Sequence, residues 1–413
     1  MNSDRTILVL GGAGLVGAQI VREIARELEP ERIVVASLYR GEVREFLHDA
    51  RREFCNVDFV GAWGDVFVRD EFMEDNRRRL IGTRSRRDSL YQDLYGGLDD
   101  AYARSGLVQL IRRYRPNVIV DCINTATAIS YQDSDSQSKR VHDLLEQLNQ
   151  AVDHQDLTAL AGLGRDVEVN VSSLIISQSL PQLIRHVQLI HRAMTEVGTR
   201  LYLKVGTTGT GGMGLNIPYT HSEDRPSFKL MSKTAVAFAH TGLMFLMART
   251  PDGPLVKELK PAAMIGYRRV AYKTVKLRGR PQMRYQSVEQ PLGQRLLLRG
   301  DETQYERLDK LHMAGVDTGE NGFFARGEFE TITHTDQMEF ITPEEIAEQA
   351  VLEILGSNTG YDVIAGIDSS VLTPSYRAGV LRQAALEKLA RIEEETGSHS
   401  VALGQLGPPQ LSK

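Results

Sequence analysis

Residues 6–17, TILVLGGAGLVG, decide how this chain folds. The first five residues are an apolar run of the β type, and the glycine-rich turn GGAGLVG follows at once. The next segment, AQIVREIARELE, places apolar residues at helical spacing, namely Ile20, Val21, Ile24 and Leu28. A strand, a glycine turn and a helix in this order predict the start of a doubly wound α/β fold with a mostly parallel sheet.

The turn carries a GxxGxxG pattern formed by Gly11, Gly14 and Gly17. Small residues at these positions allow a tight turn, let backbone N–H groups approach a pyrophosphate, and let the helix pack closely on the strand. Leu15 and Val16 lie in the same turn, at the predicted start of the helix. We therefore expect these five residues to bind a dinucleotide, with a purely structural turn as the alternative.

The second predicted strand, Arg32 to Ala36 (RIVVA), is followed by the residues SLYR. A site that prefers NAD usually places an acidic residue here to receive the ribose 2′-hydroxyl, and no acid stands at this position. Ser37 and Arg40 could instead hold a 2′-phosphate, so we expect NADP as the cofactor, with NAD possible. The alternative for Arg40 is a solvated loop residue.

The third and fourth predicted strands also end at candidate cofactor contacts. VDFVGAW, residues 57–63, leads into a Gly-Asp-Val turn that could contact the adenine edge, and NVIVDCI, residues 117–123, leads into Asn-Thr-Ala. Ligands of open α/β sheets bind at the carboxyl ends of the strands. The candidate residues at these two edges are Asp65, Val66, Asn124, Thr125 and Ala126.

The segment from Leu201 to Lys233, LYLKVGTTGTGGMGLNIPYTHSEDRPSFKLMSK, is where we expect the chemistry. An apolar strand leads into a Thr/Gly-rich turn and then into a loop with titratable side chains, before a predicted helix begins. The candidate catalytic residues of this segment are Thr208, Tyr219, His221, Lys229 and Lys233, and Thr207 is a candidate cofactor contact.

Two polar segments interrupt the alternation of strands and helices. The first, at about residues 70–105, is dense in arginine, and the second, at about residues 131–170, is predicted to be an inserted helical lobe that acts as a lid or a subunit contact. Charge runs are usually solvated faces, and contact of these arginines with a phosphate is the alternative.

We expect residues 1–266 to form the nucleotide-binding body with these inserts. Residues 267–336, rich in basic and aromatic side chains, form the predicted substrate region, where a cationic wall for a phosphorylated substrate and exposed hairpin charges are alternative interpretations. Residues 337–396 return to the body and end in a helix, and residues 397–413 form a Gly/Pro/Ser-rich flexible tail.

Composition excludes several classes of function. The chain has 413 residues, 41% of them hydrophobic, a formal charge of −5 and a pI near 6.1, so neither nucleic acid nor an anionic membrane is an expected partner. Its two cysteines have no ligand-type spacing, so we expect no metal site. Without a signal-like start or a run of about 18 apolar residues, the chain is expected to be cytoplasmic.

A predicted helix from Met231 to Met247 carries small residues that permit close helix packing, namely Ala235, Ala237, Ala239 and Gly242. Such a surface suits pairing between subunits or a tight internal contact. We expect a homo-oligomer, such as a dimer, that acts on a small-molecule substrate.

Taken together, these segments resemble the extended short-chain dehydrogenase/reductase superfamily, the NAD(P)-dependent sugar epimerases, dehydratases and related reductases. The resemblance spans most of residues 5–366. Its pieces are GGAGLVG, GDVFVRDEF, INTATA, VGTTGTGG, the SK of FKLMSK, KPAAMIG and EFITPEEIAEQAVLEIL. The resemblance also implies that Pro261 and Ile265, in the KPAAMIG run, contact the cofactor.

In that family a Ser or Thr after the fifth strand orients the substrate oxygen, a Tyr exchanges a proton with it, and a Lys four residues later positions the nicotinamide ribose. Thr207 or Thr208 matches the first role and Lys233 matches the last. Lys229 stands at the Tyr position. The chain therefore resembles an atypical member of the family.

Three accounts of this departure are open. Lys229 could itself be the acid/base, since a like charge one helical turn away and partial burial would lower its pKa towards the useful range. Tyr219 or His221 could instead replace the missing phenol. In the third account, the chain binds its cofactor without turnover, as a regulatory or scaffold protein.

The resemblance implies NAD(P)-dependent chemistry at a carbinol or carbonyl carbon of a polar, sugar-like or phosphorylated substrate. The reaction would be a net oxidation or reduction, or an epimerase or dehydratase cycle with transient oxidation. The sugar-like substrate depends on the resemblance alone.

Overall fold

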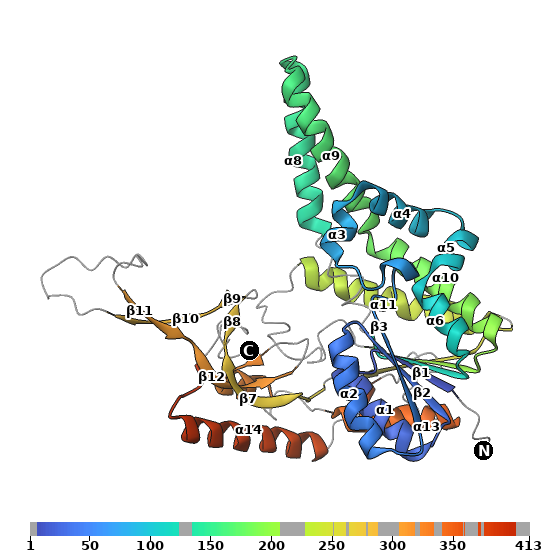
Figure 1. Ribbon diagram of the computed structural model, residues 1–413, viewed down its shortest axis with the longest axis vertical. Helices are drawn as coiled ribbons and strands as arrows, with labels where there is room; N and C mark the ends of the chain where they lie inside the picture. The colour runs from blue at the N-terminus through green and yellow to red at the C-terminus, as the bar shows by residue number, and fades with distance from the viewer. Residues whose placement is uncertain are drawn as a thin grey trace, which may run out of the picture.

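The computed structural model describes residues 6–123, 134–206, 228–250, 252–261, 264–277, 280–287, 305–318, 323–333, 341–357, 359, 371–372 and 376–401. These residues form an α/β body, a helical lobe that projects from it, and an elongated part rich in β-strands beside it (Figure 1).

The body is built on a parallel sheet, which has seven strands among the described residues, in the order β14-β6-β5-β4-β1-β2-β3. The strands are β1 (Thr6–Leu10), β2 (Arg32–Ser37), β3 (Asp58–Trp63), β4 (Val118–Asp121), β5 (Leu201–Val205), β6 (Leu255–Pro261) and β14 (Val371–Leu372). The order reverses between β1 and β4, and such a switch point opens a crevice at the carboxyl ends of the strands. The predicted doubly wound α/β fold is confirmed.

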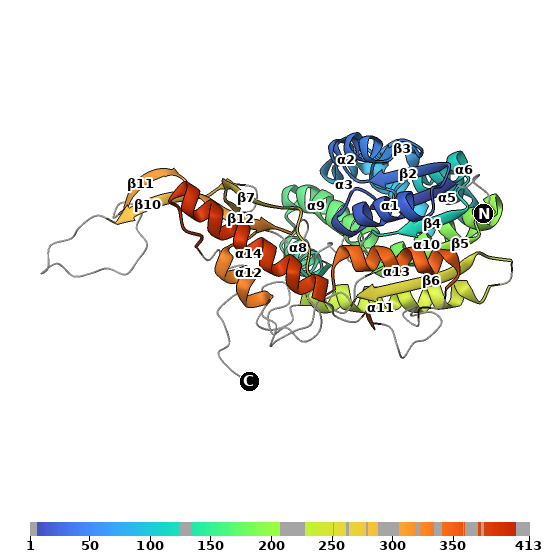
Figure 2. The same cartoon turned by 90° about the horizontal axis from the view of Figure 1, so that it is seen from below.

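Helices cover both faces of the sheet (Figures 1 and 2). One face packs on α1 (Leu15–Glu27), α2 (Arg40–Glu53) and α13 (Pro343–Leu355), and the other on α6 (Gly106–Tyr114), α10 (Ser179–Val197) and α11 (Phe228–Ala248). Side chains alternate along each strand, so Leu203 faces the first layer and Tyr202 the second. Because both faces are buried, most of the strands are nearly continuous apolar runs, and β6, with the sequence LVKELKP, departs from this pattern.

The start of α13 carries a capping box. The Thr342 hydroxyl accepts a hydrogen bond from Glu345 N at 3.3 Å, and the Glu345 carboxylate accepts one from Thr342 N at 2.8 Å. Pro343 occupies the first helical turn, where a missing N–H costs nothing. Gly356, with φ +90°, ends the helix. Local sequence therefore sets both ends of a helix that packs on α1.

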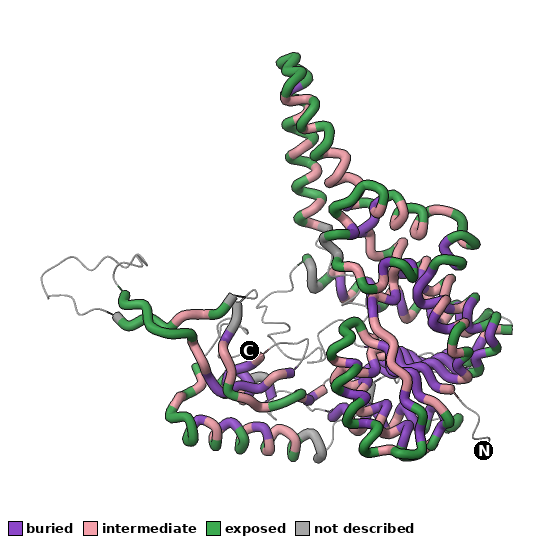
Figure 3. The backbone as a smooth tube through the Cα atoms, viewed as in Figure 1, coloured by how far each residue is buried: buried purple, intermediate pink, exposed green. Residues whose placement is uncertain are grey.

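The helical lobe combines the two inserted segments. The first contributes η1 (Asp70–Phe72), α3 (Arg77–Gly82), α4 (Arg84–Tyr95) and α5 (Leu98–Arg104), and the second contributes the hairpin of α8 (Ser134–Asp153) and α9 (Leu157–Ile176). Arg87 of α4 is 3% exposed and lies 3.0 Å from the Glu168 carboxylate of α9. This ion pair joins the two inserts, and the hairpin beyond it is largely exposed (Figure 3).

Other arginines of the first insert also pair with acids. Arg69 binds the Asp93 carboxylate at 2.7 and 2.9 Å, and Arg79 lies 3.1 Å from that of Asp75. Arg86 contacts the same Asp75 carboxylate. These contacts give the arginines structural partners in place of a ligand phosphate.

The part beside the body contains a three-stranded antiparallel sheet of β13 (Phe323–Phe324), β12 (His312–Asp317) and β7 (Arg269–Thr274). It packs on α12 (Arg326–Ile332) and α14 (Tyr376–Thr396), with Ala314, Phe329 and Leu389 among its buried residues. Two short ribbons adjoin it, namely β8 (Lys276–Leu277) with β9 (Arg280–Pro281), and β10 (Met283–Ser287) with β11 (Tyr305–Lys310). The β10–β11 ribbon extends away from the body (Figure 1).

Candidate functional site

The glycine turn after β1 requires glycine at two positions. Gly11 has φ +73°, in the left-handed region, and a Cβ there would lie 3.0 Å from the carbonyl carbon of Cys122. A Cβ on Gly17 would lie only 2.2 Å from Gly11 O. The turn, the start of α1 and the residues after β4 therefore lie in close mutual contact.

The N-terminus of α1 is suited to an anion. Gly14 is the N-cap and has no side chain to satisfy the first N–H groups, and the first turn of the helix contains no acidic residue. Gly14 N donates to Gly11 O at 2.9 Å. The next N–H groups are those of Leu15 and Val16, in the first turn of the helix. A helix N-terminus with this geometry could hold a pyrophosphate.

Ser37 and Arg40 lie at the carboxyl end of β2 but have different roles. The Ser37 hydroxyl accepts a hydrogen bond from Ala13 N at 3.1 Å, so it supports the glycine turn. The exposed Arg40 guanidinium lies 4.7 Å from the centre of the Trp63 ring, a cation–π contact with the end of β3. Arg40 therefore presents a positive charge at the carboxyl ends of β2 and β3.

After β3, Gly64 has φ +119° and Asp65 closes a turn, with its carboxylate accepting a hydrogen bond from Phe67 N at 2.9 Å. The Val66 side chain is buried in the apolar core. A ligand at this edge would meet the backbone of the turn rather than the Val66 side chain.

Several predicted site residues lie outside the described residues, namely Asn124, Thr125, Ala126, Thr207, Thr208, Tyr219 and His221. Lys229 lies in α11, but its side chain is not among those described. Lys233 is 7% exposed and lies on α11, and Pro261 is the last residue of β6. Ile265 packs into the core of the part beside the body, with Phe329 among its neighbours.

A row of buried charged residues that the sequence reasoning missed crosses the sheet near its carboxyl edge. Asp121, Lys204 and Glu258 are register partners on β4, β5 and β6, and alternation places them on the face covered by α10 and α11. Lys204 Nζ lies 3.0 Å from Asp121 Oδ1, and both residues are 2% exposed. Tyr202 donates its hydroxyl to Asp121 Oδ2 at 2.7 Å.

Burial controls the titration of groups around this row. It raises the pKa of Glu258, an effect that nearby Lys260 opposes, and it raises the pKa of Tyr202 well above its ordinary value. It lowers the pKa of Lys260, against the attraction of Glu258. Burial also lowers the pKa of His240 well below its usual range. The row therefore lies in a region of low dielectric, where charges interact strongly.

His186 of α10 should make the protein sensitive to acid. Burial lowers its pKa from 6.5 to about 4, with Asp121 opposing and Lys204 adding to the effect. As pH falls, the His186 imidazole of the unfolded chain is protonated at a higher pH than that of the folded protein. The stability of the fold is therefore unaffected by this residue above about pH 6.5 and decreases as pH falls towards about pH 4. His186→Phe should reduce the loss between about pH 7 and about pH 5 by about 2 kcal/mol in urea unfolding. His48→Phe, which replaces an exposed histidine, is the control and should leave this loss unchanged. An equal dependence of the free energy of unfolding on pH in both variants would contradict the role of His186.

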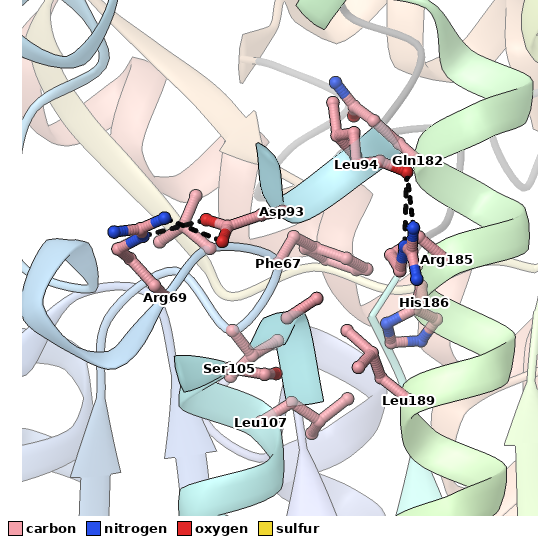
Figure 4. Close-up of a pocket in the computed structure, with 13 residues that line it drawn as sticks. Phe67, Arg69, Asp93, Leu94, Ser105, Leu107, Gln182, Arg185, His186 and Leu189 are labelled. Carbon is pink, nitrogen blue, oxygen red and sulfur yellow. Dashed lines mark hydrogen bonds and ion pairs between the residues drawn. The ribbon is translucent and has the colours of Figure 1, made fainter. Parts of the chain in front are cut away.

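A pocket lies between the residues after β3 and α10 (Figure 4). Apolar side chains, among them Phe67, Leu107 and Leu189, form much of its wall. Its charged groups have partners, since Arg69 binds Asp93 and Arg185 donates to Leu94 O at 2.9 Å. None of its lining residues comes from β4, β5 or β6, but His186, which lines the pocket, lies close enough to Asp121 and Lys204 for both to affect its pKa.

Several basic residues of the predicted substrate region have acidic partners. Arg268 lies 3.1 Å from Glu42, Lys273 lies 2.8 Å from Asp317, and Arg284 lies 2.7 Å from Asp309. These contacts support the interpretation of the basic residues as members of surface ion pairs rather than as a cationic wall for a phosphorylated substrate.

In the described part of the chain, no group of three or more His, Cys, Asp or Glu side chains could hold a metal ion. No helix of the described residues is long and apolar enough to span a membrane.

Residues 282–413 match the family described as the C-terminal domain of beta-methylindole-3-pyruvate reductase. The match covers about the last third of the chain and does not include the glycine turn. A comparison with curated proteins found no match.

Solved structures resemble the chain at low similarity. A short-chain dehydrogenase from Sphingobium yanoikuyae in complex with NADPH is 11% identical, with a TM-score of 0.36 over 96% of each chain. An actinorhodin polyketide ketoreductase variant with NADPH is 16% identical, with a TM-score of 0.32 over 64% of this chain and 72% of that one. A ketone-specific alcohol dehydrogenase from Comamonas testosteroni is 12% identical, with a TM-score of 0.33 over 64% and 74%. The fold assignment depends on the strand order above and not on these neighbours.

Proposed function

We propose that this chain is an NAD(P)-dependent oxidoreductase that acts on a carbonyl or carbinol carbon of a small molecule. The observation that carries the proposal is the glycine turn between β1 and α1, where a Cβ on Gly17 would lie 2.2 Å from Gly11 O. Such close packing brings the first N–H groups of α1 to the switch point of the sheet. In folds of this type a dinucleotide pyrophosphate binds there.

We further propose a 2-oxo acid with an aromatic side chain as the substrate class. The support is the match of residues 282–413 to a family named for a reductase of an indole-substituted pyruvate. The bound, reduced nicotinamide would supply a hydride to the carbonyl carbon. The protein would supply a proton to the oxygen, and a 2-hydroxy acid and oxidised cofactor would result. The ion-paired cations near β7 and β10 disfavour the phosphorylated substrate that the sequence suggested.

The catalytic roles that we propose lie after β5 and on α11. Lys233 would position the nicotinamide ribose, Thr207 or Thr208 would orient the substrate oxygen, and Lys229 would exchange the proton. Lys229 and Lys233 are four residues apart, which places them on one face of the helix. Tyr219 or His221 is the alternative proton donor.

An epimerase or dehydratase that acts on a sugar-like substrate is the second candidate, favoured by the motif resemblance, and a non-catalytic binding protein is the third. The fate of the cofactor distinguishes them. A reductase should consume added NADPH in proportion to substrate, whereas an epimerase or dehydratase should retain a dinucleotide that is regenerated in each cycle. Stoichiometric binding without turnover of either substrate class would favour the third candidate.

The choice between NADP and NAD should depend on Arg40. Removal of a guanidinium that binds the 2′-phosphate should raise the Kd for NADPH roughly tenfold and leave that for NADH unchanged. Fluorescence titration of Arg40→Ala with both cofactors measures this. Arg44→Ala, an exposed arginine one turn further along α2, is the matched control. Equal changes for both cofactors, or for both variants, would remove the phosphate role.

We also propose that α11 pairs with a second copy of the chain. Its outer face exposes large apolar side chains in a stripe, with Met231 at 55%, Phe238 at 59% and Leu246 at 63% exposure. The small, exposed residues Ala235 and Gly242 lie between them and permit close approach of a second helix. An exposed apolar stripe of this kind is typical of an interface.

The subunit contact can be tested at the centre of this stripe. Phe238→Glu would bury a charge in the interface, so it should convert a dimer to a monomer in analytical ultracentrifugation. Leu157→Glu, at the exposed tip of the α8–α9 hairpin, should not. A wild-type monomer, or a dimer that Phe238→Glu leaves intact, would reject the contact.

A further inference from the structure

The Asp121–Lys204 pair holds the backbone that follows β4. Ile123 N donates to Asp121 Oδ1 at 2.9 Å, and Lys204 Nζ donates to Ile123 O. The carboxylate and the ammonium thus bind the two polar groups of one residue, while their own ion pair links β4 to β5. Ile123 is the last described residue before the proposed cofactor contacts that begin at Asn124.

This backbone lies directly against the glycine turn. Cys122 N donates to Leu10 O at 2.8 Å, and a Cβ on Gly11 would lie 3.2 Å from Ile123 N. A small shift of the Cys122–Ile123 peptide would therefore enter the space that the turn needs. The position of this peptide is set on one side by Gly11 and on the other by the buried ion pair.

Stability alone does not explain a pair in this place. Removal of two charges from water is costly, and apolar residues of similar volume often stabilise a protein as well as a buried ion pair does. The neighbouring residues of β4 and β5 on the same face, Ile119 and Tyr202, are fully buried. The charges at Asp121 and Lys204 do what apolar side chains cannot, since they bind the N–H and the carbonyl of Ile123.

We propose that the Asp121–Lys204 pair is a positioning device that fixes the Cys122–Ile123 peptide against the glycine turn and so sets the affinity for the dinucleotide. The effect on affinity rests on the proposed function. The position of the peptide is a property of the free protein and can be measured without a cofactor. Lys204 is a positioning residue here, because it acts through the backbone of Ile123.

The chain offers a matched control in Lys257 of β6. Its ammonium is also buried and lies 2.5 Å from the Glu353 carboxylate, but on the opposite face of the sheet, where it ties β6 to the end of α13. Lys204→Met and Lys257→Met each leave one buried carboxylate without its cation, so both should lower the melting temperature. In Asp121→Asn/Lys204→Met no isolated charge is left, so the melting temperature should recover while Ile123 O still lacks its donor.

Hydrogen exchange of the full-length, cofactor-free variants tests the positioning. Peptides that cover residues 10–17 and 120–124 should exchange roughly tenfold faster in Lys204→Met and in the double variant. In Lys257→Met they should exchange as in the wild type. Unchanged exchange in the double variant, or equal acceleration in Lys257→Met, would overturn the proposal.

NADPH titration of the same proteins tests the link to affinity. The Kd should rise roughly tenfold in Lys204→Met and in the double variant, and stay within about twofold of the wild-type value in Lys257→Met. Faster exchange with an unchanged Kd would overturn the role in affinity. A wild-type protein that binds neither NADPH nor NADH would refute the proposed function, and the exchange result would still decide whether the pair positions the peptide.

Discussion

Gly17→Ala should weaken NADPH binding by on the order of a hundredfold, because overpacking by one methyl group costs up to about 3 kcal/mol. The new Cβ would lie 2.2 Å from Gly11 O, a backbone atom that cannot rotate away. Helix α1 would have to move from the turn, and its first N–H groups would move with it. Fluorescence titration with NADPH measures the change.

The control for this variant is Gly41→Ala, on α2 beside the end of β2, where a Cβ would meet nothing within 4 Å. It should leave binding unchanged, and alanine in a helix should stabilise the protein slightly. A thermal scan by circular dichroism shows whether Gly17→Ala still folds. A folded Gly17→Ala variant with wild-type affinity would mean that the turn does not form the dinucleotide site.

Lys233→Ala should lower turnover by roughly 10²–10⁴-fold, the range expected for a residue that supports proton transfer and cofactor orientation. Lys233 is 7% exposed on α11 and lies one helical turn before Ala237, whose carbonyl accepts a hydrogen bond from Lys260 of β6 at 3.4 Å. Its side chain is therefore buried, one helical turn from a residue that contacts β6. Steady-state kinetics with NADPH and an aromatic 2-oxo acid measures the loss.

A parallel Lys229→Ala variant distinguishes the proposed proton donors. If Lys229 exchanges the proton, its removal should lower kcat with little change in the KM for NADPH, whereas Lys233→Ala should change both. Lys139→Ala, an exposed lysine of α8, is the control for a general loss of charge. Wild-type turnover in both Lys229→Ala and Lys233→Ala would reject the catalytic assignment and direct attention to Tyr219 and His221.

The body of the fold could be predicted because its signals are local. The strand, turn and helix of residues 6–17 and the capping box at Thr342 depend on neighbours within a few residues. The requirement for glycine at Gly17 also follows from the turn itself, as does the positive φ of Gly11, whereas the contact of Gly11 with Cys122 depends on the tertiary structure. Such features can be derived from spacing and side-chain size without knowledge of the tertiary structure.

The charge row could not be predicted, because it depends on strand order and register. Asp121, Lys204 and Glu258 are separated by more than fifty residues at each step. Asp121 and Lys204 are each the one charged residue of an apolar strand, whereas β6 carries Lys257 and Lys260 as well as Glu258. A single charge near the carboxyl end of a buried strand was the available signal. Likewise, Arg87 is part of an arginine-dense run in the sequence, and only the fold brings it to Glu168.

The most direct test of the central claim is transfer of deuterium from NADPH labelled at the nicotinamide C4. The purified protein would be incubated with each of the two C4-labelled stereoisomers and an aromatic 2-oxo acid such as indole-3-pyruvate. The account predicts a 2-hydroxy acid that carries one deuterium at C2 with one of the two isomers, with equimolar oxidation of NADPH. Stoichiometric NADPH binding without a labelled product from this or any related 2-oxo acid, or retention of all the label on the cofactor while a sugar substrate is converted, would contradict it.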